Sequence, residues 1–220
     1  MKISIVIPAY NEEKRIGKVL KDIKKYKLPV IVVDDGSTDK TSLIAQKYSV
    51  EVLKRKINLG GSKGAALKTG VEVAFKQGAD AVILMDSDGQ HEASDIPNFI
   101  KALEKGFDVV LGSRNLSLGV PLIRFLGNKF ASILINLFFG IYISDLICGY
   151  RAMTKEAFEK IKWESLNYAV ETEMIVRLSK TKLKYCEVPV ETIYHDKAKG
   201  VTIIDAVNTF FDVISWKINL

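Results

Sequence analysis

Apolar and polar positions alternate in blocks along the first half of the chain. Short runs rich in β-branched residues are separated by longer stretches whose apolar residues recur with helical spacing. The short runs are predicted as strands at 3–8, 30–34, 50–53, 81–86 and 108–112, and the stretches as helices near 12–25, 40–48, 63–77 and 95–105. This alternation is typical of an α/β fold with a mostly parallel sheet that is covered by helices on both faces.

The second half of the chain has a different pattern. A long apolar stretch occupies 121–143, and it is followed by a predicted strand at 148–153, a helix at 168–180, a strand at 184–190 and a closing helix at 202–217. There is no internal repeat and no linker rich in Pro, Gly or Ser. We therefore expect one domain that comprises residues 1–220.

The predicted helix at 122–139 is apolar over most of its surface. Its polar residues Arg124, Asn128, Ser132 and Asn136 recur every four positions and form one narrow stripe. A bilayer-spanning helix needs about 20 apolar residues, so this segment is too interrupted to cross a membrane. It is expected to be buried on most sides or to lie in a membrane interface. The closing amphipathic helix is a second candidate for such an interface, although ordinary core packing is favoured for it.

The chain carries a formal net charge of +6 and has an isoelectric point near 9.1. This excess of positive charge favours an anionic partner. Charge alone does not decide whether that partner is nucleic acid, a phosphorylated small molecule or an anionic membrane. Cys148 and Cys186 have neither zinc-site spacing nor the pattern of a disulfide framework. A reducing, cytoplasmic setting fits these two cysteines best.

Ligands of parallel α/β sheets bind beyond the carboxyl ends of the strands. The fourth predicted strand is followed there by Asp86, Ser87, Asp88 and Gln90. Two carboxylates and an amide oxygen are hard ligands suited to Mg²⁺ or Mn²⁺, and diphosphate oxygens would complete the coordination. The plain alternative is a polar turn that ends a strand.

Other strand ends carry further candidates. Asp34 and Asp35 follow the second strand, where one carboxylate can bind a ribose or base edge while the other opens a turn and caps a helix. The glycine-rich segment 58–64 precedes a helix, so its amides and Lys63 are candidates for holding phosphate. The segment is not a Walker A motif, because the GK[ST] ending is absent.

The residues that could act as a base bear on what kind of group could accept a transferred group. The two histidines are not spaced as a metal pair and no nucleophile elbow is present, which disfavours a hydrolytic triad. A hydroxyl acceptor requires a base, for which Glu171 or Glu173 is available, whereas a phosphate monoester is already charged near neutral pH. The shortage of bases favours a phosphate acceptor, with Arg114 and Arg124 as its partners.

Three motifs together carry a family resemblance. Residues 6–12, 32–39 and 86–91 resemble, in this order, the corresponding motifs of family 2 glycosyltransferases with the GT-A fold. Residues 112–114, 145–152 and 187–190 are similar to the branch that comprises the polyprenyl (dolichyl) phosphate mannose and glucose synthases. The resemblance covers nearly the whole chain.

This resemblance implies an inverting enzyme that transfers mannose or glucose from GDP-mannose or UDP-glucose to a polyprenyl phosphate, with Mg²⁺ or Mn²⁺ as cofactor. It implies a nucleotide-sugar half at 1–115 and an acceptor half at 116–220. It also implies peripheral contact with the inner, cytoplasmic face of a membrane through the helices near 122–139 and 202–217. Nucleic acid is not expected as a partner.

The resemblance also assigns residues by position. Asp88 and Arg114 are the expected catalytic residues. The expected nucleotide-sugar ligands are Pro8, Tyr10, Glu12, Val33, Asp35, Asp86, Ser87 and Lys199, the metal ligands are Asp86, Asp88 and Gln90, and the acceptor phosphate ligands are Arg114 and Arg124. Relatives often carry a basic residue in the loop after 187–190, for which this chain offers Lys197 or Lys199.

Two alternatives stay open at this stage. One is a family 2 transferase with a saccharide or other hydroxyl acceptor. The other is a non-catalytic protein that keeps the fold only for binding a nucleotide sugar or a membrane.

Overall fold

The computed structural model describes residues 1–55, 62–114, 122–191 and 203–219 of the 220-residue chain. In the helices that border the gaps, side chains are described for 126–139 and 208–218. The expected positions Lys197 and Lys199, and the side chain of Arg124, therefore lie outside the described residues.

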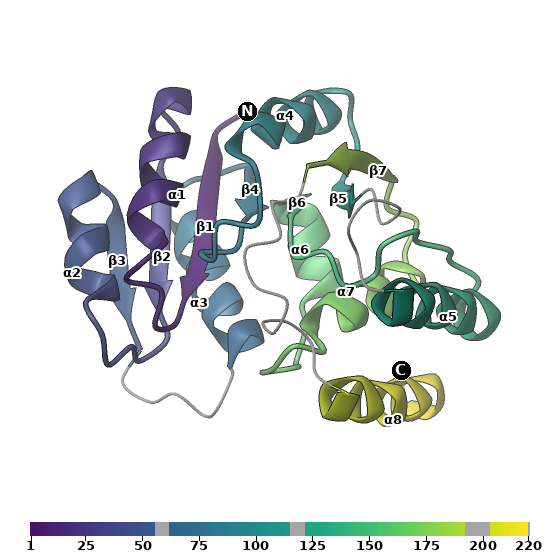
Figure 1. The fold of residues 1–220 in the computed structure, drawn as a ribbon. Coiled ribbons are helices and arrows are strands. Elements are labelled where there is room, and N and C mark those ends of the chain that lie inside the picture. Colours follow the sequence, from purple (N-terminus) through teal and green to yellow (C-terminus); the bar gives the residue numbers. More distant parts are fainter. Residues whose placement is uncertain (56–61, 115–121, 192–202, 220) are drawn as a thin grey trace.

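The strands of the described residues form one seven-stranded sheet with the order β3-β2-β1-β4-β6-β5-β7 (Figure 1). Neighbouring strands are parallel except for β6, which is antiparallel to both β4 and β5. The predicted mostly parallel sheet is thus confirmed. The strands are β1 (Ile3–Ala9), β2 (Val30–Asp34), β3 (Glu51–Lys54), β4 (Ala81–Leu84), β5 (Val109–Arg114), β6 (Arg151–Thr154) and β7 (Tyr185–Val190).

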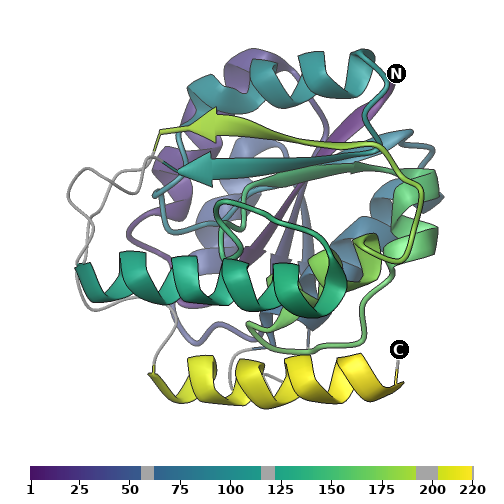
Figure 2. The same ribbon diagram turned by 90° about the vertical axis from the view of Figure 1, so that its right-hand side faces the viewer.

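Helices cover both faces of this sheet (Figures 1 and 2). One face packs against α1, α2 and α4, and the other packs chiefly against α3, α6 and α7. The helices are α1 (Ile16–Ile23), α2 (Thr41–Ala45), α3 (Lys63–Lys76), α4 (Ile96–Glu104), α5 (Leu122–Phe139), α6 (Lys155–Ile161), α7 (Val170–Leu178) and α8 (Ile203–Asn219).

Helix α6 is absent from the sequence prediction. It begins at the residue after β6, without a loop to mark the change of period, and it is only seven residues long. Thr154 ends the strand and caps the helix, because its side-chain oxygen accepts a hydrogen bond from the Ala157 amide at 3.1 Å. A strand that runs directly into a capped helix leaves no turn signal of Gly, Pro or Asn.

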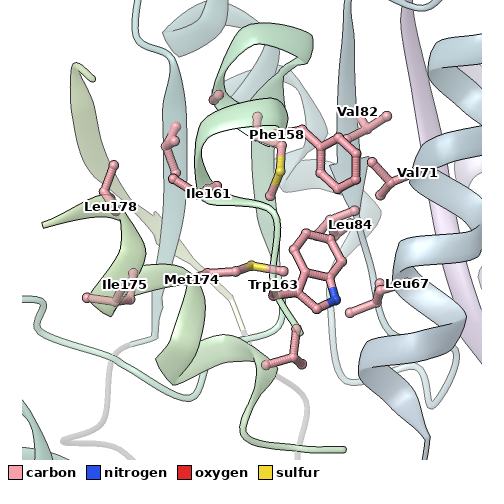
Figure 3. Close-up of a cluster of buried hydrophobic side chains, with 14 of the residues drawn as sticks. Leu67, Val71, Val82, Leu84, Phe158, Ile161, Trp163, Met174, Ile175 and Leu178 are labelled. Carbon is pink, nitrogen blue, oxygen red and sulfur yellow. The ribbon is translucent and has the colours of Figure 1, made fainter. Parts of the chain in front are cut away.

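Aromatic side chains hold α6 and the segment after it on the sheet. Phe158 and Trp163 are buried and meet edge to face, with ring centroids 5.4 Å apart (Figure 3). The indole Nε1 of Trp163 donates to the carbonyl oxygen of Gly64 at 2.8 Å, so a polar group inside the core is satisfied. This contact fixes the first turn of α3, which carries Lys63.

The close approach of α3 to the sheet depends on Gly70. A Cβ atom at this position would lie 2.4 Å from Val6 Cγ1 and 2.8 Å from Val33 Cγ2. Both valines are fully buried, so they have little room to move.

We expect Gly70→Ala to lower the free energy of unfolding by about 1–3 kcal/mol, because the added methyl group overpacks the core. Urea denaturation measures this change. Gly127→Ala is the matched control, since Gly127 is exposed in α5 and an added Cβ meets no atom within 4 Å. Equal stability of the two variants would contradict the packing argument.

Candidate active site

The loops after β1, β2 and β4 leave the sheet at the same edge. Ala9 at the end of β1 is paired with Asp34 at the end of β2, and the Met85 amide after β4 donates to the Val6 carbonyl of β1 at 3.1 Å. Because the three strands are parallel, their carboxyl ends bring the predicted motifs together.

The loops after β1 and β2 are joined by hydrogen bonds. Asn11, whose φ of 53° is left-handed, accepts from the Thr38 amide at 2.9 Å and donates its own amide to Ser37 Oγ at 2.9 Å. The Glu12 amide donates to Thr41 Oγ1 at 2.8 Å. These bonds make the two loops a rigid platform, from which the side chain of Tyr10 is 47% exposed.

The two aspartates after β2 have separate environments. Asp34 accepts the Ser37 amide at 2.8 Å and the Ser42 hydroxyl, so it takes the turn-forming role that the sequence offered to one of the pair. Asp35 is buried and accepts hydrogen bonds from Arg55 and Ser62. Arg55 is not predicted from the sequence: it lies two residues beyond the predicted strand at 50–53 and directly after the observed β3, which ends at Lys54.

Two of the residues expected at the nucleoside are buried in the sheet. Pro8 lies within β1, and the side chain of Val33 is fully buried in the core that packs on Gly70. A nucleoside contact from Val33, as expected from the sequence, would have to be made by its main chain.

A partly buried ammonium group, that of Lys63, lies at the centre of the site. Lys63 Nζ is 2.7 Å from Asp86 Oδ1 and 2.8 Å from Glu171 Oε1. Burial alone would lower the pKa of Lys63, but the two carboxylates outweigh it and raise this pKa above its usual value. Burial conversely favours protonation of Asp86, yet Lys63 holds the pKa of Asp86 below its ordinary value.

Gly149 makes room for this ion pair. A Cβ atom at position 149 would lie 2.7 Å from Asp86 Oδ2 and 2.8 Å from Lys63 Nζ. The main chain that precedes β6 therefore packs directly against the charged groups. The sequence analysis quoted Gly149 within a motif but gave it no role, because only the fold shows what it faces.

Asp88 is the second carboxylate of the acidic turn. Its Oδ1 accepts the Gln90 amide at 3.0 Å, while burial and then the neighbouring Asp86 raise the pKa of Asp88 to about 6. Between the two aspartates, the expected nucleotide-sugar ligand Ser87 is buried.

His91 packs beside this turn and hydrogen-bonds to its main chain. Its Nδ1 accepts the Asp86 amide at 3.2 Å, and its ring stacks on Tyr150 at a centroid distance of 4.8 Å. Burial lowers the pKa of His91 to about 4, so the ring is neutral near pH 7.

Neither candidate base from the sequence has an uncommitted carboxylate. Glu171 pairs with Lys63, as described above. Glu173 is fully buried and accepts the amides of Glu164 at 2.9 Å and Ser165 at 2.7 Å, together with Arg177 Nε at 2.6 Å. These contacts disfavour Glu173 as a base, because its carboxylate organises the loop before α7.

Arg114, the last residue of β5, is held by Asp145. The Nε and Nη2 atoms of Arg114 lie 2.6 and 2.8 Å from the two carboxylate oxygens, and its amide donates to Oδ2 at 3.2 Å. This fork-to-fork geometry fixes the guanidinium plane. Beside it is an open cleft of about 400 Å³, which is lined by Asp95, Ser113, Arg114, Pro189, Val190 and Glu191.

Arg151, another residue that the sequence analysis missed, ties the turn before β6 to α7. Its guanidinium is buried and donates to the carbonyl oxygens of Leu146 at 2.6 Å, Cys148 at 2.9 Å and Glu171 at 2.7 Å. The residue therefore connects the main chain next to Gly149 with the helix that supplies Glu171. Its own sequence context, inside an apolar strand, gives no signal of this role.

The acidic turn has the donor chemistry of a divalent cation site. Asp86, Asp88 and Gln90 offer oxygen ligands within one turn, which suits Mg²⁺ or Mn²⁺. Lys63 is shared by Asp86 and Glu171, so these two carboxylates and Asp88 together carry an excess of negative charge. Within the described ranges, no three acidic, histidine or cysteine side chains are grouped so that they could hold a metal ion.

Comparison with known proteins first gives the class of fold. The chain matches the solved structure of glucosyl-3-phosphoglycerate synthase from Mycobacterium tuberculosis in complex with Mn²⁺, UDP-glucose and phosphoglyceric acid, with a TM-score of 0.76 at 20% identity. The match covers 98% of this chain and 79% of that one. The architecture is therefore the GT-A fold.

The family follows from the sequence. The model of glycosyl transferase family 2 matches residues 4–162, and the chain belongs to this family of glycosyltransferases. It is 31% identical to UDP-N-acetylglucosamine–dolichyl-phosphate N-acetylglucosaminyltransferase of Methanococcus voltae, over 98% of this chain and 96% of the relative. It is 28% identical to dolichol-phosphate mannosyltransferase of Pyrococcus furiosus, over 99% of this chain and 65% of the relative.

These names confirm the resemblance to enzymes that act on polyprenyl or dolichyl phosphate. Among the helices that the structure describes, none is both long and apolar enough to cross a bilayer.

Proposed function

We propose that this protein transfers the sugar of a nucleotide sugar to the phosphate of a polyprenyl phosphate, with inversion at the anomeric carbon. The observation that carries the proposal is the engagement of both candidate bases, Glu171 by Lys63 and Glu173 by the loop before α7. A hydroxyl acceptor would need a base to take its proton, and these are the two carboxylates that the sequence offered for that role. A phosphate monoester does not, because its second pKa is about 6.

The donor belongs to the half formed by residues 1–115. Tyr10, Glu12 and Asp35 are proposed to bind the nucleoside at the joined loops, and Asp86, Asp88 and Gln90 to hold Mg²⁺ or Mn²⁺. The cation supplies positive charge that stabilises the departing diphosphate. Lys63 places a second positive charge beside the same carboxylates, and Gly149 keeps that space open.

The acceptor belongs to the half formed by residues 116–220 together with the end of β5. Arg114 is proposed to receive the lipid phosphate, and its pairing with Asp145 preorganises the guanidinium for this role. Arg124 and a lysine at 197 or 199 are proposed as further cations. The enzyme then acts by positioning an ionised oxygen against the anomeric carbon, without a covalent intermediate.

We propose mannose or glucose as the sugar, carried by GDP or UDP. The named relatives differ in their sugar, so the test includes UDP-N-acetylglucosamine as well. A saccharide acceptor remains the second candidate. It would require Glu171 to leave Lys63, from which it is separated by only 2.8 Å.

The transfer is tested with Mn²⁺ and radiolabelled GDP-mannose, UDP-glucose or UDP-N-acetylglucosamine, with and without polyprenyl phosphate, followed by organic extraction. We expect label in the organic phase only when the lipid is present. Asp88→Asn should lower the rate of transfer to the lipid at least about 100-fold, because it removes a carboxylate that is proposed to hold the cation at the diphosphate. Glu104→Gln, at an exposed position of α4, is the matched control.

Transfer to a saccharide or to water, with none to the lipid, would contradict the proposed acceptor. Unchanged lipid labelling by Asp88→Asn would contradict the proposed metal site.

Membrane contact is proposed to occur through α5 and α8, which lie side by side (Figures 1 and 2). The polar stripe of α5 faces inward at Asn128 and Ser132, where Ile135 is buried as well, while four other apolar residues of the helix are exposed. On α8, Val213 packs into the core, but other apolar side chains are exposed. The exposed residues are Leu126, Phe130, Ile133 and Leu137 of α5, and Phe210, Phe211, Ile214 and Ile218 of α8.

An apolar surface of this kind, on a chain with an excess of basic residues, fits an anionic bilayer interface. We propose the cytoplasmic face, where nucleotide sugars are available to the same molecule.

We expect the protein to float with vesicles that contain phosphatidylglycerol, and Ile133→Ser/Leu137→Ser to bind them at least about tenfold more weakly, since each inserted side chain contributes about 1.5–3 kcal/mol. Vesicle flotation at low salt measures this. Leu43→Ser removes a comparably exposed leucine from α2 and should bind like the wild type. A wild-type protein that stays wholly in the soluble fraction would rule out the interfacial surface.

A further inference from the structure

Asn128 of α5 is buried although it belongs to a helix whose outer face is apolar. Its Nδ2 donates to the Ser144 carbonyl oxygen at 3.0 Å, and its Oδ1 accepts the Leu146 amide at 3.2 Å. Both the nitrogen and the oxygen of the side-chain amide are thus hydrogen-bonded to one turn, residues 144–146. A buried polar group without a partner is costly, so these bonds hold α5 and the turn together.

The same turn is bound from the opposite side by the sheet. The amide and hydroxyl of Ser144 donate to Glu187 Oε1 of β7 at 2.9 and 2.6 Å. The hydroxyl also lies 2.7 Å from Ser113 Oγ of β5. The turn is therefore a rigid link between α5 and the edge of the sheet.

Asp145 is the middle residue of this turn and carries the carboxylate that grips Arg114. Its side chain is fully buried and makes three hydrogen bonds to that one arginine. A displacement of the turn would move Asp145, and Arg114 would follow or lose its partner. The path from Asn128 to Arg114 runs only through neighbouring residues of one turn.

We infer that Asn128 is a positioning residue for Arg114, acting through the 144–146 turn and Asp145. It binds neither Arg114 nor a reacting group. The mechanical part of this inference stands on the contacts alone, whereas its effect on catalysis rests on the proposed acceptor role of Arg114. The consequence is that the helix with the exposed apolar face and the arginine for the acceptor phosphate form one unit.

Amide hydrogen exchange measured by NMR tests the mechanical link without any substrate. Two amides report on it: that of Leu146, which donates to Asn128, and that of Arg114, which donates to Asp145. In Asn128→Ala we expect both to exchange at least about tenfold faster than in the wild type, with the amides of β1 unchanged. Asn136→Ala, exposed on the same helix, should leave both rates unchanged.

Faster exchange at Leu146 with a wild-type rate at Arg114 would overturn the inference, and so would unchanged rates at both. Asn128→Ser keeps a short polar side chain and is the milder variant if the alanine protein does not fold. Its Arg114 amide must change in the same direction.

The catalytic consequence is tested with polyprenyl phosphate as the acceptor. Asn128→Ala should raise KM for the lipid at least about tenfold and leave KM for the nucleotide sugar within about twofold. In combination with Arg114→Lys, the two effects should be smaller than their product, because they act along one path. Multiplicative effects, or equal changes in both KM values, would overturn this part.

The two failures are distinguishable. If the wild type does not label the lipid but the exchange at Arg114 still depends on Asn128, the proposed acceptor is wrong and the positioning link stands. If the lipid is labelled but the exchange at Arg114 does not depend on Asn128, the proposed acceptor stands and the positioning link is wrong.

Discussion

The ion pairs of one partly buried lysine ammonium group organise this site. Taking a charge out of water is costly, and Asp86 and Glu171, which face Lys63 from two different parts of the chain, compensate this cost. These three residues bring together the end of β4, the start of α3 and the start of α7. Gly149 lets the main chain close over them, and Trp163 fixes the turn of α3 that presents the lysine. A third carboxylate, Asp88, lies in the same acidic turn as Asp86.

The antiparallel strand β6 explains how the proposed donor and acceptor sites share one edge of the sheet. Because β6 lies between β4 and β5, the chain that precedes it passes both strand ends. That stretch brings Gly149 to Asp86 and Asp145 to Arg114. Arg151 fastens it to α7 through three carbonyl oxygens. A single short segment therefore sets the geometry of the proposed donor and acceptor sites.

The sequence predicts what local periodicity and turn chemistry determine. The strands, the positions of the acidic motifs at one edge, and the apolar α5 all follow from spacing that a parallel sheet imposes. The sequence does not predict pairings between distant residues. Glu171 and Glu173 look equivalent in sequence, yet Glu171 pairs with Lys63 and Glu173 accepts amides of the preceding loop. The reason is that helix positions two residues apart point in different directions. The orientation of α5, with Asn128 inside, depends likewise on a turn that lies elsewhere in the sequence.

We propose above all that the diphosphate and its cation bind at the acidic turn after β4, next to Lys63. Diffraction at the manganese absorption edge, from crystals grown with Mn²⁺ and GDP or UDP, tests this binding place most directly. We expect an anomalous peak within coordination distance of the Asp88 carboxylate, with the diphosphate beside Lys63. A bound nucleotide with its diphosphate away from Lys63, or a manganese peak remote from Asp86 and Asp88, would contradict it.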